Sequence, residues 1–285
     1  MSTATSAMST ATSAAPPREA SDESPTAAFR TRSGQSASRR PGVMSVIRSE
    51  WIKLRSTRSA WWCIALALLI PMAFGVLITS QSDEGNAIFF SLAGMQFASA
   101  VILVLAALAV TSEYRFATIR ATLQAQPGRT RVLWTKAGVI AGLAFVVGEV
   151  AAFATFVVSR QFDDTGALVL GSADDWRLVA GYGLVYALLA TIAVAVGSLV
   201  RQPAGAITLL LVWSLALEGL IGLIPGVGDD IYRLLPFVNG TLFAGDPQIT
   251  GVTDPLSTLG SLGLLAGTAL ALLGLATLVL HRRDA

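Results

Sequence analysis

The stretch TSEYRFATIRATLQAQPGRTRVLWTK, residues 111–136, decides the fold because it lies between two long apolar runs. It holds five basic residues and one acid, whereas the runs at about 88–110 and 137–158 carry almost no charge. A bilayer-spanning helix needs roughly 20 apolar residues, which both runs supply. A charged segment between two such runs indicates a loop that joins two membrane spans.

The composition of the whole chain agrees with a membrane protein. Of 285 residues, 53% are hydrophobic and 13% are charged, about half the charged share of a typical soluble domain. We therefore expect an all-α fold in which residues 44–285 form one six-span domain. The six apolar runs lie at about 60–79, 88–110, 137–158, 178–200, 205–224 and 256–280.

Residues 1–43 differ from the rest of the chain. MSTATSA occurs at 1–7 and again at 8–14, followed by a stretch rich in Ser, Ala, Pro and Arg. Such a segment buries too little apolar surface to offset its ordering entropy, so we expect a disordered low-complexity tail. Two interpretations remain open: a tail that binds anionic lipid or regulates the protein, or a dispensable extension with translation beginning at Met44.

The distribution of basic residues predicts the orientation of the spans. Most Lys and Arg fall in segments that would lie on one side of the membrane. Residues 1–59 hold nine, residues 111–136 hold five, and Arg201, Arg282 and Arg283 add three. Only Arg160, Arg177 and Arg233 fall on the other side, which carries ten of the 18 acids. By the positive-inside rule we expect a multi-pass protein of the plasma membrane with both termini cytoplasmic.

Two amphipathic helices are expected on the cytoplasmic side. In 44–58, apolar residues recur at helical spacing, which predicts a helix that lies in the membrane interface. Within 111–136, Phe116, Ile119 and Leu123 form one stripe, Thr111 or Ser112 could cap the helix, and Pro127-Gly128 would end it. The alternative for 111–136 is a loop whose arginines only fix orientation.

The sequence excludes several classes of enzyme. The two lysines, Lys53 and Lys136, do not follow a GxxxxG stretch, so the chain has no phosphate-binding loop and is not expected to hydrolyse ATP. The lone Cys63 and the lone His281 offer no zinc site and no catalytic dyad. We expect no enzymatic activity, no metal site and no nucleic-acid partner.

Five segments resemble the membrane permeases of the ATP-binding-cassette type-2 exporter family, in its actinobacterial form. They are MSVIRSEWIKLRSTRSAWW (44–62), TSEYRFATIRATLQAQPGRTRVLWTKA (111–137), RQPAGAI (201–207), LVWSLALEGLIGLIPG (211–226) and LPFVNG (235–240). The resemblance covers about 44–285, with the first two segments the most specific. It implies a six-span permease that dimerises, with itself or with a related chain, and exports a substrate using ATP and Mg bound to a separate nucleotide-binding subunit.

The resemblance also implies roles for particular residues. Residues 112–126 would be the coupling helix that contacts the ATPase, and 44–58 would be the interfacial elbow. The candidates for ATPase coupling are Glu113, Tyr114, Arg115, Phe116 and Arg120. The candidates for the elbow are Trp51, Lys53, Arg55 and Arg58. For Arg115 and Arg120, contact with lipid phosphates is the alternative.

Two acids lie inside predicted spans, where an ionisable group is costly and therefore suggests function. Glu149 and Glu218 are expected at a depth similar to that of Gln96 and Tyr186, so the four could line a translocation path. The alternative for Glu149 and Glu218 is a buried hydrogen bond or a protonated carboxyl that fixes packing.

Two other functions stay open. The chain could be a membrane anchor or regulatory scaffold, or a small secondary transporter that uses Glu149 and Glu218. The residues of the spans do not identify a substrate.

Overall fold

The computed structural model describes residues 43–81, 87–115, 129–164, 166, 168–245, 252 and 254–283. The predicted tail up to residue 42 and the loop segment 116–128 lie outside these ranges. The described residues belong to one compact unit, Arg40–Ala285. Every regular element among them is a helix, and six helices are long and apolar enough to cross a membrane. The prediction of an all-α protein with six transmembrane helices is confirmed.

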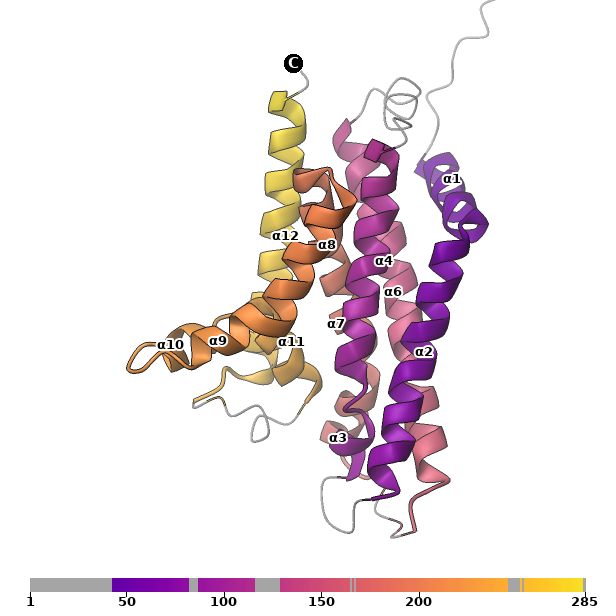
Figure 1. The fold of residues 1–285 in the computed structure, drawn as a ribbon, viewed down its shortest axis with the longest axis vertical. Helices are drawn as coiled ribbons and strands as arrows, with labels where there is room; N and C mark the ends of the chain where they lie inside the picture. The colour runs from indigo at the N-terminus through magenta and orange to yellow at the C-terminus, as the bar shows by residue number, and fades with distance from the viewer. Residues whose placement is uncertain are drawn as a thin grey trace, which may run out of the picture. The chain divides into compact units, whose positions relative to one another are not determined.

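The elements follow one another around a helical bundle (Figure 1). In chain order they are α1 (Val43–Ser56), α2 (Arg58–Thr79), α3 (Ala87–Ser91), α4 (Met95–Arg115), α6 (Arg129–Arg160), α7 (Ala173–Val200), α8 (Pro203–Val212), a π-helical segment (Trp213–Leu217), α9 (Glu218–Gly222), α10 (Gly228–Tyr232), α11 (Pro236–Ala244) and α12 (Thr258–Arg283). The six spans are α2, α3 with α4, α6, α7, the run from α8 through α9, and α12.

Two span boundaries differ from the predicted ones for identifiable reasons. The run 88–110 is divided between α3 and α4 by a turn at 92–94, where Gly94 lies against α2. A Cβ atom on Gly94 would lie 2.5 Å from the Cα of Pro71, so only glycine permits this approach. The third span begins at Arg129 rather than near 137, because the charged residues before the apolar run continue the same helix.

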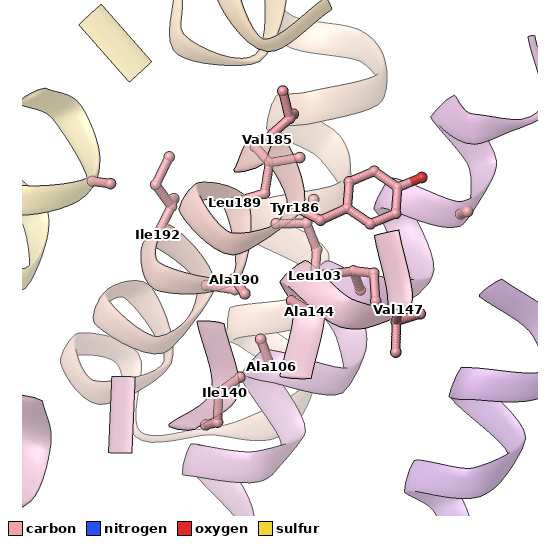
Figure 2. Packing of buried hydrophobic residues seen from close by; sticks show 14 of the residues in the cluster. Leu103, Ala106, Ile140, Ala144, Val147, Val185, Tyr186, Leu189, Ala190 and Ile192 are labelled. Atoms are coloured by element: carbon pink, nitrogen blue, oxygen red, sulfur yellow. The ribbon is translucent and has the colours of Figure 1, made fainter. Parts of the chain in front are cut away.

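The core is centred on α7, the most deeply buried of the six spans. Figure 2 shows Tyr186, Leu189 and Ala190 of α7 packed against residues of α4 and α6, among them Leu103 and Ala144. Alanine is frequent in this cluster, and small side chains let membrane helices pack closely. Because α7 packs directly against α4 and α6, a movement of either helix would displace α7 as well.

Both chain ends of the six-span domain lie at one end of the bundle, which we call the α1 end (Figure 1). At this end, the last turns of α12 lie beside the start of α6: His281 Nε2 and Thr130 Oγ1 are 2.7 Å apart, and Trp134 Nε1 donates to Thr277 Oγ1. An even number of spans requires this arrangement. It is consistent with the prediction that both termini share one side of the membrane.

Candidate functional site

Four charged side chains from three helices meet at the α1 end. Glu50 and Lys53 belong to α1, Glu113 lies in the last turn of α4, and Lys136 lies in the second turn of α6. Lys53 Nζ donates to Glu50 Oε1 and to Glu113 Oε1, both at 2.7 Å. Lys136 Nζ donates to Glu113 Oε1 at 2.9 Å and to Glu50 Oε2. The four residues form a closed ring of alternating charge, here called the ion cluster.

Three of the four groups in the ion cluster are buried. Glu50 and Lys136 are each 3% exposed and Glu113 is 6% exposed, whereas the side chain of Lys53 is 44% exposed. A charge removed from water is costly unless it is paired and hydrogen-bonded. The ring supplies this pairing, because each carboxylate accepts from both lysines. The cluster therefore stays together as a unit, with no net charge.

The pKa values of Glu50 and Lys53, the two residues of the ion cluster on α1, indicate that both side chains are ionised. Burial by itself raises the pKa of Glu50, but the attraction and hydrogen bonds of Lys136 and Lys53 outweigh it and hold this pKa below the ordinary 4.5. Burial by itself lowers the pKa of Lys53, but its bonds to Glu113 and Glu50 outweigh this and raise the pKa above 10.5. Both groups are charged at neutral pH.

Local structure explains how α1 presents its two charges. Glu50 and Lys53 are one helical turn apart and share a face of α1. α1 ends at Ser56, and Thr57 alone separates it from α2. The junction is closed by Thr57 Oγ1, which donates to the carbonyl of Lys53 at 2.7 Å, and by Trp61 Nε1, which donates to the carbonyl of Arg55 at 3.0 Å.

A second contact joins the end of α4 to the turn between α7 and α8. The guanidinium carbon of Arg201 lies 5.3 Å from the centre of the Tyr114 ring, a cation–π contact. Arg201 has a left-handed backbone, with φ of 60°, which ends α7 and turns the chain into α8. The last turn of α4 thus contacts α1 and α6 through Glu113 and the α7–α8 turn through Tyr114.

The predicted coupling residues have different positions. Glu113 is buried in the ion cluster, so it positions helices rather than presenting a charge on the surface. Tyr114 is half-buried beneath Arg201, and Arg115 is exposed at the end of α4. Phe116 and Arg120 lie outside the described residues. The predicted cap at Thr111 or Ser112 is wrong, because α4 continues to Arg115 and Thr111 Oγ1 donates to Ala107 O within it. The rest of the predicted loop helix lies outside the described residues.

The four elbow candidates are all exposed. Trp51 and Arg55 of α1 and Arg58 of α2 are exposed. Lys53 of α1 is exposed too, and its ammonium group also belongs to the ion cluster. Its charge anchors α1 to the bundle.

The four candidates for a translocation path have different surroundings. Gln96 is exposed on α4. Tyr186 is buried, and its hydroxyl donates to the carbonyl of Met95 at 2.6 Å. Glu149 is half-buried where α6 meets α7, against Gly183. The hydroxyl of Tyr186 thus makes a buried hydrogen bond that joins α7 to the start of α4.

Glu218 has a defined structural role. It is 2% exposed, and its carboxylate accepts from the backbone N–H groups of Phe237 at 3.1 Å and of Val238 at 2.7 Å. These are two of the otherwise unpaired N–H groups at the start of α11. Glu218 therefore holds α11 against the end of the fifth span.

We expect Glu218→Ala to lower the free energy of unfolding by about 1–3 kcal/mol, because two buried N–H groups lose their acceptor. Glu218→Gln keeps one acceptor oxygen and should cost less. The measurement is unfolding of the purified chain in mixed micelles. Asp229→Ala, which removes an exposed acid of α10, is the control. Equal stability of Glu218→Ala and Asp229→Ala would contradict the role of Glu218.

Glu50 and Lys136 were not among the candidates from the sequence. One signal was available: the chain has only two lysines, and both belong to the ion cluster. Among the described residues, no group of three or more His, Cys, Asp and Glu side chains could hold a metal ion. No protein-family model and no curated protein matches the chain.

Proposed function

We propose that the chain is the membrane permease half of an ATP-driven exporter, working with a separate nucleotide-binding subunit. The segments quoted from 44–285 support this proposal through their resemblance to type-2 permeases. ATP and Mg would bind to the partner. The chain would act as a homodimer or pair with a related permease in the plasma membrane. The substrate stays open.

The ion cluster is the observation that carries the proposal. Residues 112–126 are the part of the chain proposed to contact the ATPase, and segment 116–128 connects α4 to α6. The cluster joins Glu113, three residues before the segment's start, to Lys136, eight residues after its end, and joins both to α1. A force on 116–128 would therefore reach α1, α4 and α6 together, and through the packing of α4 and α6 it would reach α7.

The charges at the α1 end support a cytoplasmic position for it. The exposed basic residues Arg55, Arg58, Arg115 and Arg131 lie there. A surplus of basic residues near span ends is typical of the cytoplasmic side. An ATPase that docks on 116–128 needs this orientation, because ATP is present in the cytoplasm.

Affinity purification of the full chain from its own membranes in mild detergent tests the proposal. We expect a protein with a Walker-type phosphate-binding loop to purify with the chain at a fixed ratio. A chain that purifies without such an ATPase would contradict the proposal and favour an anchor or scaffold. A secondary transporter is not favoured, because Glu218, one of its two carboxylates, is bound to the start of α11.

A further inference from the structure

A cavity of about 500 Å³ opens next to the ion cluster. Its walls come mainly from α2 and α4, with α1 and the start of α6 closing one end.

Lys53, Ser59 and Arg115 line the part of the cavity nearest the α1 end. Leu105, Leu108 and Ala109 line the part that extends along α4 toward the middle of the span. At 1.5 Å per residue, Leu105 lies about 15 Å below Arg115. The cavity is thus polar at the membrane surface and apolar below it.

In the halves away from the α1 end, α2 and α4 are in close contact. There, the rings of Phe74 and Phe97 have centroids 4.8 Å apart, and Gly94 lies against Pro71. Toward the α1 end the two helices diverge (Figure 1). The space between them lies at the depth where the headgroup and the first carbons of a membrane lipid would be.

The accessible charge in the cavity is positive. The two acids that line it, Glu50 and Glu113, are buried and bound to lysines. Lys53 is 44% exposed, and its bonds to the two acids use two of the three N–H donors of its ammonium group. Arg115 is an exposed residue that lines the same mouth. A ligand entering here therefore meets cationic donors first and apolar walls second.

We propose that this cavity binds one anionic phospholipid. Its phosphate lies between Lys53 and Arg115, since ammonium and guanidinium groups both bind phosphate. One acyl chain lies along Leu105, Leu108 and Ala109. A zwitterionic lipid brings a second cationic group to a mouth that is already positive, so anionic headgroups are preferred. This inference needs no ATPase and is tested on the chain alone. Arg115 enters both this inference and the proposed function, since a guanidinium group carries five N–H donors.

The single cysteine of the chain provides a direct probe of occupancy. Cys63 lies in the cavity wall on α2 and is half-buried. The full chain, without any partner, is placed in nanodiscs of phosphatidylcholine with or without 20% phosphatidylglycerol, and the rate of Cys63 labelling by a small maleimide is measured. If the anionic lipid fills about four fifths of the sites, labelling slows about fivefold, since only empty cavities react.

Two variants that narrow the cavity test the location. Ala109→Phe fills the apolar part, and Ser59→Phe narrows the mouth at an exposed position that tolerates a larger side chain. Leu270→Phe, on the exposed face of α12, is the matched control. Native mass spectrometry counts the phosphatidylglycerol retained by each chain. We expect retention by the wild type and Leu270→Phe and a loss of at least about fivefold in both cavity variants, matching the labelling effect.

Four outcomes of the binding experiments would overturn the proposal. They are equal labelling of Cys63 with and without phosphatidylglycerol, equal retention of phosphatidylcholine, full retention by Ser59→Phe and Ala109→Phe, and equal protection by inorganic phosphate alone, which would indicate a free-anion site. Oxidative cross-linking of Cys63 between two chains in the membrane would also overturn it, because a second copy would then occupy the cavity.

Discussion

Replacing Lys136 with methionine is expected to lower the free energy of unfolding by about 3–5 kcal/mol, the usual cost of breaking a buried ion pair from one side. Lys136 is 3% exposed and bonded to both Glu50 and Glu113. Without its ammonium group, two buried carboxylates share the single charge of Lys53. The remaining cluster then carries a net negative charge, which the low-dielectric surroundings penalise.

Unfolding of the purified chain by sodium dodecyl sulfate in mixed micelles measures this loss. Arg160→Met, at the other end of α6, removes an exposed basic residue from the same helix and should change stability by less than about 0.5 kcal/mol. A loss below about 1 kcal/mol for Lys136→Met, within the range of an exposed pair, would show that the cluster does not hold the three helices together.

A second variant separates charge balance from packing. Glu50→Met together with Lys136→Met removes one acid and one base, which leaves Lys53 paired with Glu113. Because the cluster is again neutral, we expect the double variant to be more stable than Lys136→Met alone. A double variant that loses the sum of the two single losses would mean that Glu50 and Lys136 act independently.

Reversing Arg115 and Arg120 to glutamate is expected to leave membrane insertion intact and to abolish ATP-driven transport. Each arginine is proposed to bind an acidic or carbonyl acceptor on the ATPase, and a hydrogen bond to a charged group contributes about 1.5–3 kcal/mol. Loss of two such bonds lowers the affinity for the partner by about two orders of magnitude or more. The measurements are the amount of ATPase that purifies with the chain and the ATP-driven export in inverted vesicles.

The matched control is Arg129→Glu with Arg131→Glu, which reverses two charges in the same connecting region. Because it reverses the same number of charges, it should affect the orientation of the spans and contact with lipid phosphates as much as Arg115→Glu with Arg120→Glu does. We expect it to keep most of the bound ATPase. Equal loss in both double variants would favour contact with lipid phosphates, and unchanged transport by Arg115→Glu with Arg120→Glu would end the coupling hypothesis.

The spans could be predicted because the length and composition of a bilayer helix are set by the membrane itself. Their boundaries could not be predicted as well, because a helix does not stop where the membrane does. α6 continues through its charged start at Arg129, and α4 continues past the apolar run to Arg115. Conversely, the run at 88–110 is broken at Gly94, where close contact with Pro71 decides the backbone path.

The ion cluster could not be derived from spacing along the chain. Glu50 and Lys53 are one turn apart, but Glu113 and Lys136 come from two other helices, and only the packing of α1 on α6 brings them within hydrogen-bonding distance. The role of Glu218 also depends on tertiary structure. Its depth in the fifth span suggested a translocation path, whereas the position of α11 makes it the acceptor for two backbone N–H groups.

The central claim, that a partner ATPase drives this chain, is tested most directly by ATP hydrolysis in liposomes that contain the chain and the ATPase that purifies with it. The account predicts vanadate-sensitive hydrolysis that requires both proteins and is lost with Arg115→Glu and Arg120→Glu. Hydrolysis at the same rate with and without the chain would contradict it.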